Sequence, residues 1–188
     1  MWKCELSVGN RIKKKGLNMK SDYDVIKDFL KNENNDEIFE NSVAVWIDWR
    51  EYEEDIVEYF NKKLPDETKI ILEFVDNQKN YGNDIILKNS NKSLQIPYDD
   101  VMERDVTIKY VNELIKPEYE IRWFMESLGS DTLAFILLNN EEWKKLEEEF
   151  GVDFVKYCFS PININTKMFG LGIGEVLKYM KNYKKEQN

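Results

Sequence analysis

Histidine is absent from this sequence of 188 residues, and cysteine is rare, with only Cys4 and Cys158. Histidine is the commonest general base and the commonest metal ligand, so a Ser-His-Asp or Cys-His mechanism is excluded within this chain. The two cysteines lie far apart and match no metal-binding spacing, which argues against a structural zinc site. We therefore expect no cofactor, no metal and no catalytic residues.

The sequence also lacks a long apolar run. No stretch approaches the ~18 apolar residues that a membrane-spanning helix needs. The N-terminal residues MWKCELSVGNRIKKK are interrupted by charge and do not form the apolar region of a signal peptide. These absences predict a cytoplasmic protein with no membrane partner.

Charge is abundant but uneven along the chain, whose formal net charge is −9. Residues 1–20 carry a net charge of +5, residues 21–166 carry −17, and residues 167–188 carry +3. The excess of carboxylates in residues 21–166 is expected to repel nucleic acid and anionic membranes. It favours a cationic partner, or serves solubility alone.

The length is that of one domain with short tails. We predict a single domain over residues 21–160. Residues 1–20 are expected to be a basic extension that is disordered or not native, with Met19 as an alternative start to Met1. Residues 161–188 are expected to form an irregular segment followed by a basic helix.

Apolar spacing and turn residues predict an α+β fold, a mostly antiparallel sheet of about five strands with helices packed on one face. Strands are expected at 43–47, 69–75, 84–88, 93–96, 118–125 and 132–138, the last of them central. Helices are expected from Ser21, at 49–63, 101–115, 141–150 and 152–158, and at 175–185.

The most informative segment is 43–60, VAVWIDWREYEEDIVEYF, where a strand is expected to lead directly into helix 49–63. Asp48 and Glu51 have the spacing of a capping box. Four carboxylates, Glu51, Glu54, Asp55 and Glu58, have the spacing of one helix face, and like charges there cost about 0.2–0.5 kcal/mol per pair. This acidic stripe is interpreted either as a solvated face or as a surface for a basic partner.

The aromatic residues of this segment are expected to face the core. The apolar face of helix 49–63 is predicted to consist of Trp49, Tyr52, Ile56, Tyr59 and Phe60. Trp46 and Trp49 have an alternative place in an interface beside the acidic stripe, because tryptophan is enriched at binding hot spots.

A second acidic cluster consists of Asp99, Asp100, Glu103 and Asp105, between a strand and a helix. Carboxylates at a helix start are stabilised by the helix dipole, so capping alone accounts for most of this cluster. If the cluster lies near the acidic stripe in space, the two form one anionic surface. Asp99, Asp100 and Glu103 are therefore candidate partner-binding residues together with Trp49 and the stripe.

Two other patterns suggest chemistry only weakly. Asp131, Glu142 and Lys144 are the nearest approach to a magnesium-dependent nuclease pattern, but Glu142 and Lys144 fall at a helix start and do not converge. Residues Gly170–Gly174 precede a helix as a phosphate loop does, yet no P-loop lysine follows. A flexible or apolar turn is the interpretation favoured there.

Two segments, WIDWREYEEDIVEYF at 46–60 and YEIRWFMESLGSDTLAFILLNNEEWKKLEEEFG at 119–151, resemble small acidic bacterial proteins of unknown function. Several such proteins are immunity proteins that neutralise polymorphic toxins. The resemblance implies an inhibitor that binds a basic toxin domain directly and performs no chemistry. The alternatives are a carboxylate-based, magnesium-dependent enzyme and a structural or regulatory module.

Overall fold

The computed structural model describes residues 20–40, 42–76, 83–96 and 105–185. The predicted extension 1–20 lies almost wholly outside these ranges. In chain order the helices and strands are α1 (Asp22–Asn32), α2 (Asp36–Glu40), β1 (Val45–Asp48), α3 (Glu53–Asn61), η1 (Asp66–Thr68), β2 (Ile71–Asp76), β3 (Asn83–Lys88), β4 (Ser93–Ile96), α4 (Asp105–Ile115), β5 (Tyr119–Phe124), η2 (Met125–Ser127), β6 (Thr132–Asn139), α5 (Asn140–Phe150), α6 (Val152–Cys158), β7 (Phe159–Pro161) and α7 (Ile173–Lys185).

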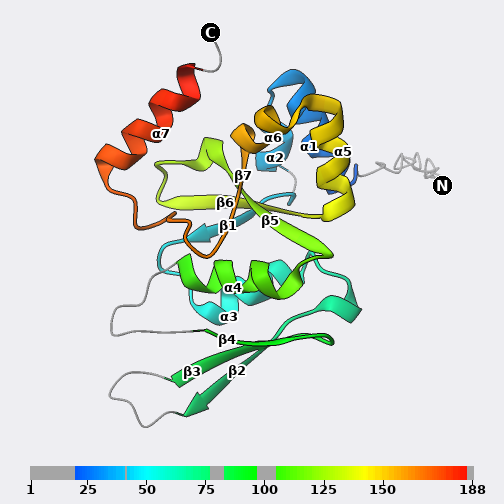
Figure 1. The fold of residues 1–188 in the computed structure, drawn as a ribbon, viewed down its shortest axis with the longest axis vertical. Coiled ribbons are helices and arrows are strands. Elements are labelled where there is room, and N and C mark those ends of the chain that lie inside the picture. Colours follow the sequence, from blue (N-terminus) through cyan, green and yellow to red (C-terminus); the bar gives the residue numbers. More distant parts are fainter. Residues whose placement is uncertain (1–19, 41, 77–82, 97–104, 186–188) are drawn as a thin grey trace, which may run out of the picture.

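The predicted α+β class is confirmed, but the described strands form two antiparallel sheets where one was expected. The larger sheet has the order β1-β6-β5-β7, and the smaller has the order β2-β3-β4. Figure 1 shows the resulting layers. Helices α1, α2, α5 and α6 cover one face of the larger sheet, and α3 and α4 lie between the two sheets. Helices therefore occupy both faces of the larger sheet, and the expected arrangement on one face is wrong.

The strand at 132–138 has the predicted interior place. It forms β6, which pairs with β1 on one side and β5 on the other, with Ala134 opposite Trp46. Its residues from Leu133 to Leu138 are all buried, because helices pack against both faces of the sheet. This burial explains why TLAFILL is a continuous apolar run rather than an alternating one.

Each face of the larger sheet has its own core. The core toward α1, α5 and α6 is aromatic, with Phe29 and Phe159 both within 5.4 Å of the Phe124 ring centroid. The core between the sheets is mainly aliphatic and is built around Phe60 of α3 and Trp123 of β5, which are almost fully buried. Because α4 belongs to this core and lies between two sheets, it is buried on nearly all sides.

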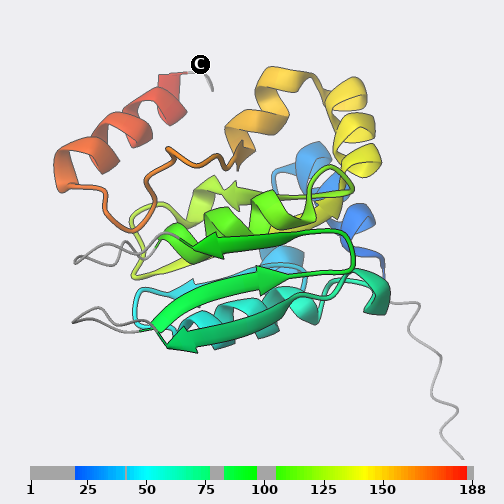
Figure 2. The ribbon, with the colours of Figure 1, turned by 60° about the horizontal axis from the view of Figure 1, so that its bottom comes forward.

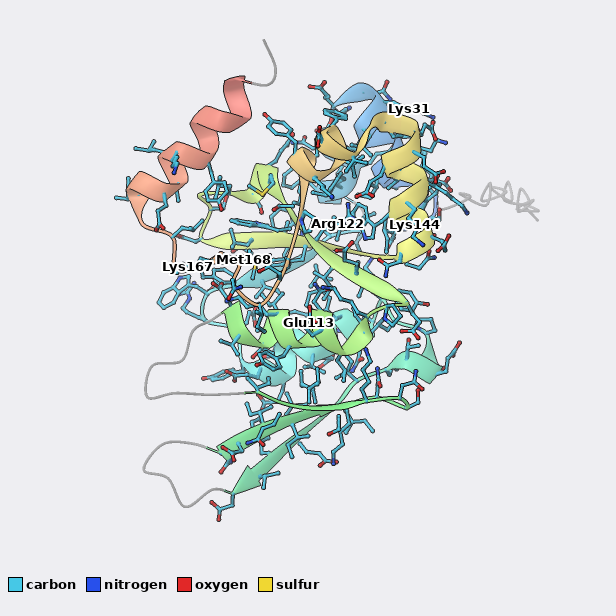
Figure 3. All side chains as sticks on the ribbon, viewed as in Figure 1. Lys31, Glu113, Arg122, Lys144, Lys167 and Met168 are labelled. Carbon is cyan, nitrogen blue, oxygen red and sulfur yellow. The ribbon has the colours of Figure 1, made fainter. Side chains whose placement is uncertain are left out.

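Two polar residues of α4 hold the segment between β7 and α7 against the domain. Asn112 is fully buried; its Oδ1 accepts from the Ile121 amide at 2.7 Å, and its Nδ2 donates to the Ile162 carbonyl at 3.0 Å. Asp105 accepts from the amides of Met168 and Phe169, each at 2.9 Å. Figure 3 shows Met168 beside the first turn of α4. The segment has no helix or strand of its own between 162 and 172, so these side chains satisfy backbone groups that no ladder reaches.

We predict that Asn112→Ala lowers the free energy of unfolding by about 2–4 kcal/mol, because two buried backbone groups lose their partners. Asn165→Ala is the matched control: Asn165 is exposed, and its replacement should change the free energy by no more than about 0.5 kcal/mol. Urea denaturation followed by tryptophan fluorescence measures both. Equal effects of the two substitutions would contradict the role given to Asn112.

Burial of Cys158 makes a second prediction. The side chain is buried, and burial raises the pKa of its thiol to about 12. In a Cys4→Ser background, a thiol-specific reagent at pH 8 should label Cys158 only after unfolding. Because the pKa is raised in the folded state, stability from this group is present below the ordinary thiol pKa and is lost as the pH rises toward 12. Rapid labelling of the folded protein at pH 8 would show that Cys158 is accessible.

Candidate partner-binding surface

The segment that follows β1 is a turn, and the helix begins later than the sequence predicts. Asp48 Oδ1 accepts from both the amide and the Nε of Arg50 at 2.9 Å, and the Asp48 carbonyl accepts from the Glu51 amide at 3.1 Å. This turn shifts the helix start to Glu53, with Tyr52 as the N-cap residue. The predicted capping box of Asp48 and Glu51 is wrong, because Arg50 competes for the Asp48 carboxylate.

The first turn of α3 is acidic, with Glu53, Glu54 and Asp55 at its N-terminus. The helix dipole stabilises carboxylates at this position, which offsets part of their mutual repulsion. These carboxylates lie at the helix N-terminus and not in the middle of the helix, so folding itself accounts for part of the negative charge here.

The four carboxylates of the predicted stripe differ in their surroundings. Glu51 precedes the helix, and its Oε2 accepts from the Tyr59 hydroxyl at 3.2 Å. Glu58 pairs with Lys62 at 2.9 Å, with both side chains more than 60% exposed. Glu54 and Asp55 form no ion pair with any described residue. The uncompensated part of the stripe is thus Glu54 and Asp55, with Glu51 and Glu58 beside them.

The negative charge of this region contributes to the raised pKa values of Tyr59 and Arg50. Partial burial raises the pKa of the Tyr59 hydroxyl, and the nearby carboxylates of Glu51 and Asp55 raise it further. The hydrogen bonds that Arg50 donates to the Asp48 carboxylate raise the pKa of its guanidinium, with a smaller contribution from Asp131. Asp131, which immediately precedes β6, therefore contributes to the same electrostatic environment. Its proximity to Arg50 could not be predicted, because the two residues lie far apart in the sequence.

The aromatic residues nearest this charge face the solvent. Trp49 is 47% exposed and Tyr52 is 71% exposed, so the prediction that they face the core is wrong. They precede the helix, and helical periodicity does not apply to them. Ile56 and Phe60, which lie within α3, are buried as predicted. The Arg50 guanidinium lies 5.3 Å from the Trp49 ring centroid.

The candidate site comprises residues of α3 and of the turn before it. We call it the acidic–aromatic surface, and it consists of Trp49, Glu51, Tyr52, Glu54, Asp55 and Glu58. Beside it, a groove of about 220 Å³ runs between the start of β1 and α3, with Trp46 and Tyr59 among its lining residues. Trp46 stacks on Phe39 with ring centroids 5.2 Å apart, which fixes its ring at the edge of this groove.

The second predicted acidic cluster lies mostly outside the described residues. Asp99, Asp100 and Glu103 lie outside the described residues. Asp105 is described, and it is buried against the 168–169 backbone rather than exposed to a partner. Its carboxylate therefore has a structural role.

The residues considered for magnesium chemistry serve structural roles where the structure describes them. Glu142 forms the true capping box of α5 with Asn139, in which the Asn139 amide donates to Glu142 Oε2 at 3.1 Å. Lys144 pairs with Glu141 at 2.6 Å on the exposed side of the same helix. Across the described part of the chain, no group of three or more acidic or cysteine side chains is placed to hold a metal ion.

A separate cavity of about 700 Å³ lies between α7 and residues 160–167, with Leu171 and Glu175 among its lining residues. The Gly172 amide there donates to Glu175 Oε2 at 2.9 Å. This carboxylate occupies the helix N-terminus, where a phosphate would have to bind.

Comparison with protein-family models, curated proteins and solved structures finds no match to this chain. Within the described ranges, no helix combines the length and apolarity needed to cross a bilayer.

The exposure of Trp49 and Tyr52 makes a direct prediction. Trp49→Ala and Tyr52→Ala should each change the free energy of unfolding by no more than about 0.5 kcal/mol, because neither side chain is buried in the core. Phe60→Ala, by contrast, should cost about 3–5 kcal/mol, because Phe60 is fully buried. Chemical denaturation of the three variants compares them. A loss at Trp49 or Tyr52 as large as that at Phe60 would place these aromatic residues in the core.

Proposed function

We propose that this protein is a non-enzymatic binding protein that takes a basic protein partner on its acidic–aromatic surface. The observation that carries the proposal is the exposure of Trp49 and Tyr52 in the turn that leads into the acidic first turn of α3. Tryptophan, tyrosine and arginine are the residues most enriched at binding hot spots. An exposed pair of large aromatic rings has no role in the core, so a partner gives them a function.

Charge supports the same proposal. Glu54 and Asp55 have no described counter-ion, and the chain as a whole carries −9. A concentrated negative surface accelerates encounter with a cationic protein and rejects partners of like charge. The aromatic rings would then supply the apolar contact that holds the complex once it has formed.

The resemblance of residues 46–60 and 119–151 to small acidic bacterial proteins narrows the proposal to an immunity protein. Its partner would be a toxin domain with a basic active-site cleft, neutralised by direct binding in the cytoplasm. The absence of histidine agrees with a protein that blocks an enzyme without performing a reaction itself.

The test begins by capturing the partner with tagged protein in the source cells and identifying it by mass spectrometry. Isothermal titration calorimetry then compares the wild type with a variant carrying Glu54→Lys, Asp55→Lys and Glu58→Lys. We expect affinity to fall by about 100-fold or more, and protection against a toxin partner to be lost. Wild-type affinity should also weaken as salt concentration rises.

The matched control reverses the charge of three exposed carboxylates away from α3. It carries Glu141→Lys and Glu148→Lys on α5 and Asp153→Lys on α6. Both triple variants change the net charge by the same amount, so any general effect of charge is shared. Circular dichroism confirms that each is folded. If the α3 variant binds as tightly as the control, the acidic–aromatic surface is not the binding site.

A further inference from the structure

The strand β2 forms an edge of the smaller sheet. Among the described strands it pairs with β3 alone, and Figure 2 shows it at the outer border of the three-stranded sheet. Three of its six residues are large, apolar and exposed: Ile71 is 60% exposed, Phe74 45% and Val75 41%. An edge strand with free backbone groups and an apolar surface is a template for another strand.

Proline, lysine and a bulge, which protect many edge strands, are missing from β2, although it carries Glu73 and Asp76. Its pairing with β3 runs without a bulge from Ile71 to Asp76. Other edges in the molecule differ: β7 has only three residues and ends at Pro161, and β4 has only four residues. We infer that β2 pairs with β2 of a second copy of this chain, joining the two small sheets into one continuous sheet.

A two-fold axis at Glu73 gives the pairing its register. An antiparallel pair in one continuous sheet must place opposite residues on the same face, so each residue pairs with one an even number of positions away. An axis at Glu73 sets Ile71 opposite Val75 of the second copy. It also sets Leu72 opposite Phe74 of the second copy on the face toward α3 and α4, where Leu72 packs on the core. Every large apolar side chain of the strand then has an apolar partner.

Charges along this axis are balanced. The axis brings the two Glu73 carboxylates together, but each is already paired with Lys88 of its own chain. Two carboxylates and two ammonium groups therefore meet at the centre, with no net charge. This balance favours a second copy over a strongly charged partner, which the acidic–aromatic surface would suit better.

The side chain of Asn61 sets the limit of the paired segment. Its Nδ2 donates to the Ile70 carbonyl at 2.8 Å, and its Oδ1 accepts from the Ile70 amide at 2.8 Å. An added strand cannot bond to Ile70, so pairing starts at β2 itself. The inferred dimer uses β2 of the smaller sheet, whereas the proposed partner binds α3 and the turn before it, so the two proposals rest on different residues.

The first experiment is sedimentation equilibrium of the full-length protein over a concentration series. A pairing of residues 71–75 predicts reversible dimerisation with a dissociation constant on the order of 10 μM. Val75→Lys should weaken it at least about 10-fold, whereas Val152→Lys should leave it unchanged. Val152 is a matched control because it is 45% exposed and lies at the start of α6. A protein that stays monomeric throughout, or equal weakening by both variants, overturns the inference.

The second experiment tests the register by disulfide formation in a Cys4→Ser background, with Cys158 protected by burial. Opposite residues in an antiparallel pair have Cα atoms about 4.5–5.5 Å apart, which suits a disulfide. Glu73→Cys should therefore cross-link two copies under mild oxidation. Ile71→Cys is the control: the same residue in the second copy lies about 13 Å further along the strand. Equal cross-linking at the two positions, or none at Glu73→Cys, overturns the pairing.

Discussion

The layer of α3 and α4 between two sheets is the constraint on which this structure depends. A helix in that position must offer apolar side chains in more than one direction, and α4 does so with Ile108, Val111, Leu114 and Ile115. The larger sheet must then be apolar on both faces, since helices cover each of them. This requirement explains the continuous apolar run in β6 and the separation of the core into an aromatic part and an aliphatic part.

Burial of α4 on nearly all sides has a consequence for the C-terminal part of the chain. The residues after β7 have no strand to pair with, yet Ile162 and Met168 are buried against this layer. Their backbone groups would be costly if left unpaired. The polar side chains of Asp105 and Asn112 satisfy these groups from inside the core. Asp105, which the sequence placed in a candidate acidic cluster, and Asn112 therefore stabilise the fold.

Helix α3 packs against β1, β2 and α4 but leaves one side exposed, and this difference from α4 makes a candidate binding surface available. Ile56, Val57 and Phe60 face the core, while Glu54 and Glu58 on the other side are exposed. The turn fixed by Asp48 and Arg50 holds Trp49 and Tyr52 outside the helix. Because the apolar face already anchors α3, the outer face can carry charges and rings that folding does not need.

Sequence reasoning predicted the elements with strong local signals and missed those that depend on distant contacts. The run TLAFILL predicted a central strand, and the predicted helix 141–150 corresponds to α5, which begins one residue earlier at Asn140. The division into two sheets was not predictable, because it depends on which strands pair across the chain. Asp48 and Glu51 had capping-box spacing, but the competing Arg50 lay within the same motif, and only the three-dimensional contacts reveal which interaction prevails.

Charge balance distinguishes the two surfaces that this structure offers to other molecules. On β2 each carboxylate of Glu73 has a lysine beside it, so pairing two copies brings together groups whose charges cancel. On α3 the carboxylates of Glu54 and Asp55 have no such neighbour among the described residues, and a cationic partner would neutralise them. Salt screens an attraction between net charges far more than it affects apolar contact and strand pairing. Rising ionic strength should therefore dissociate a complex at α3 while leaving association through β2 intact, so the two can be separated in one protein without any substitution.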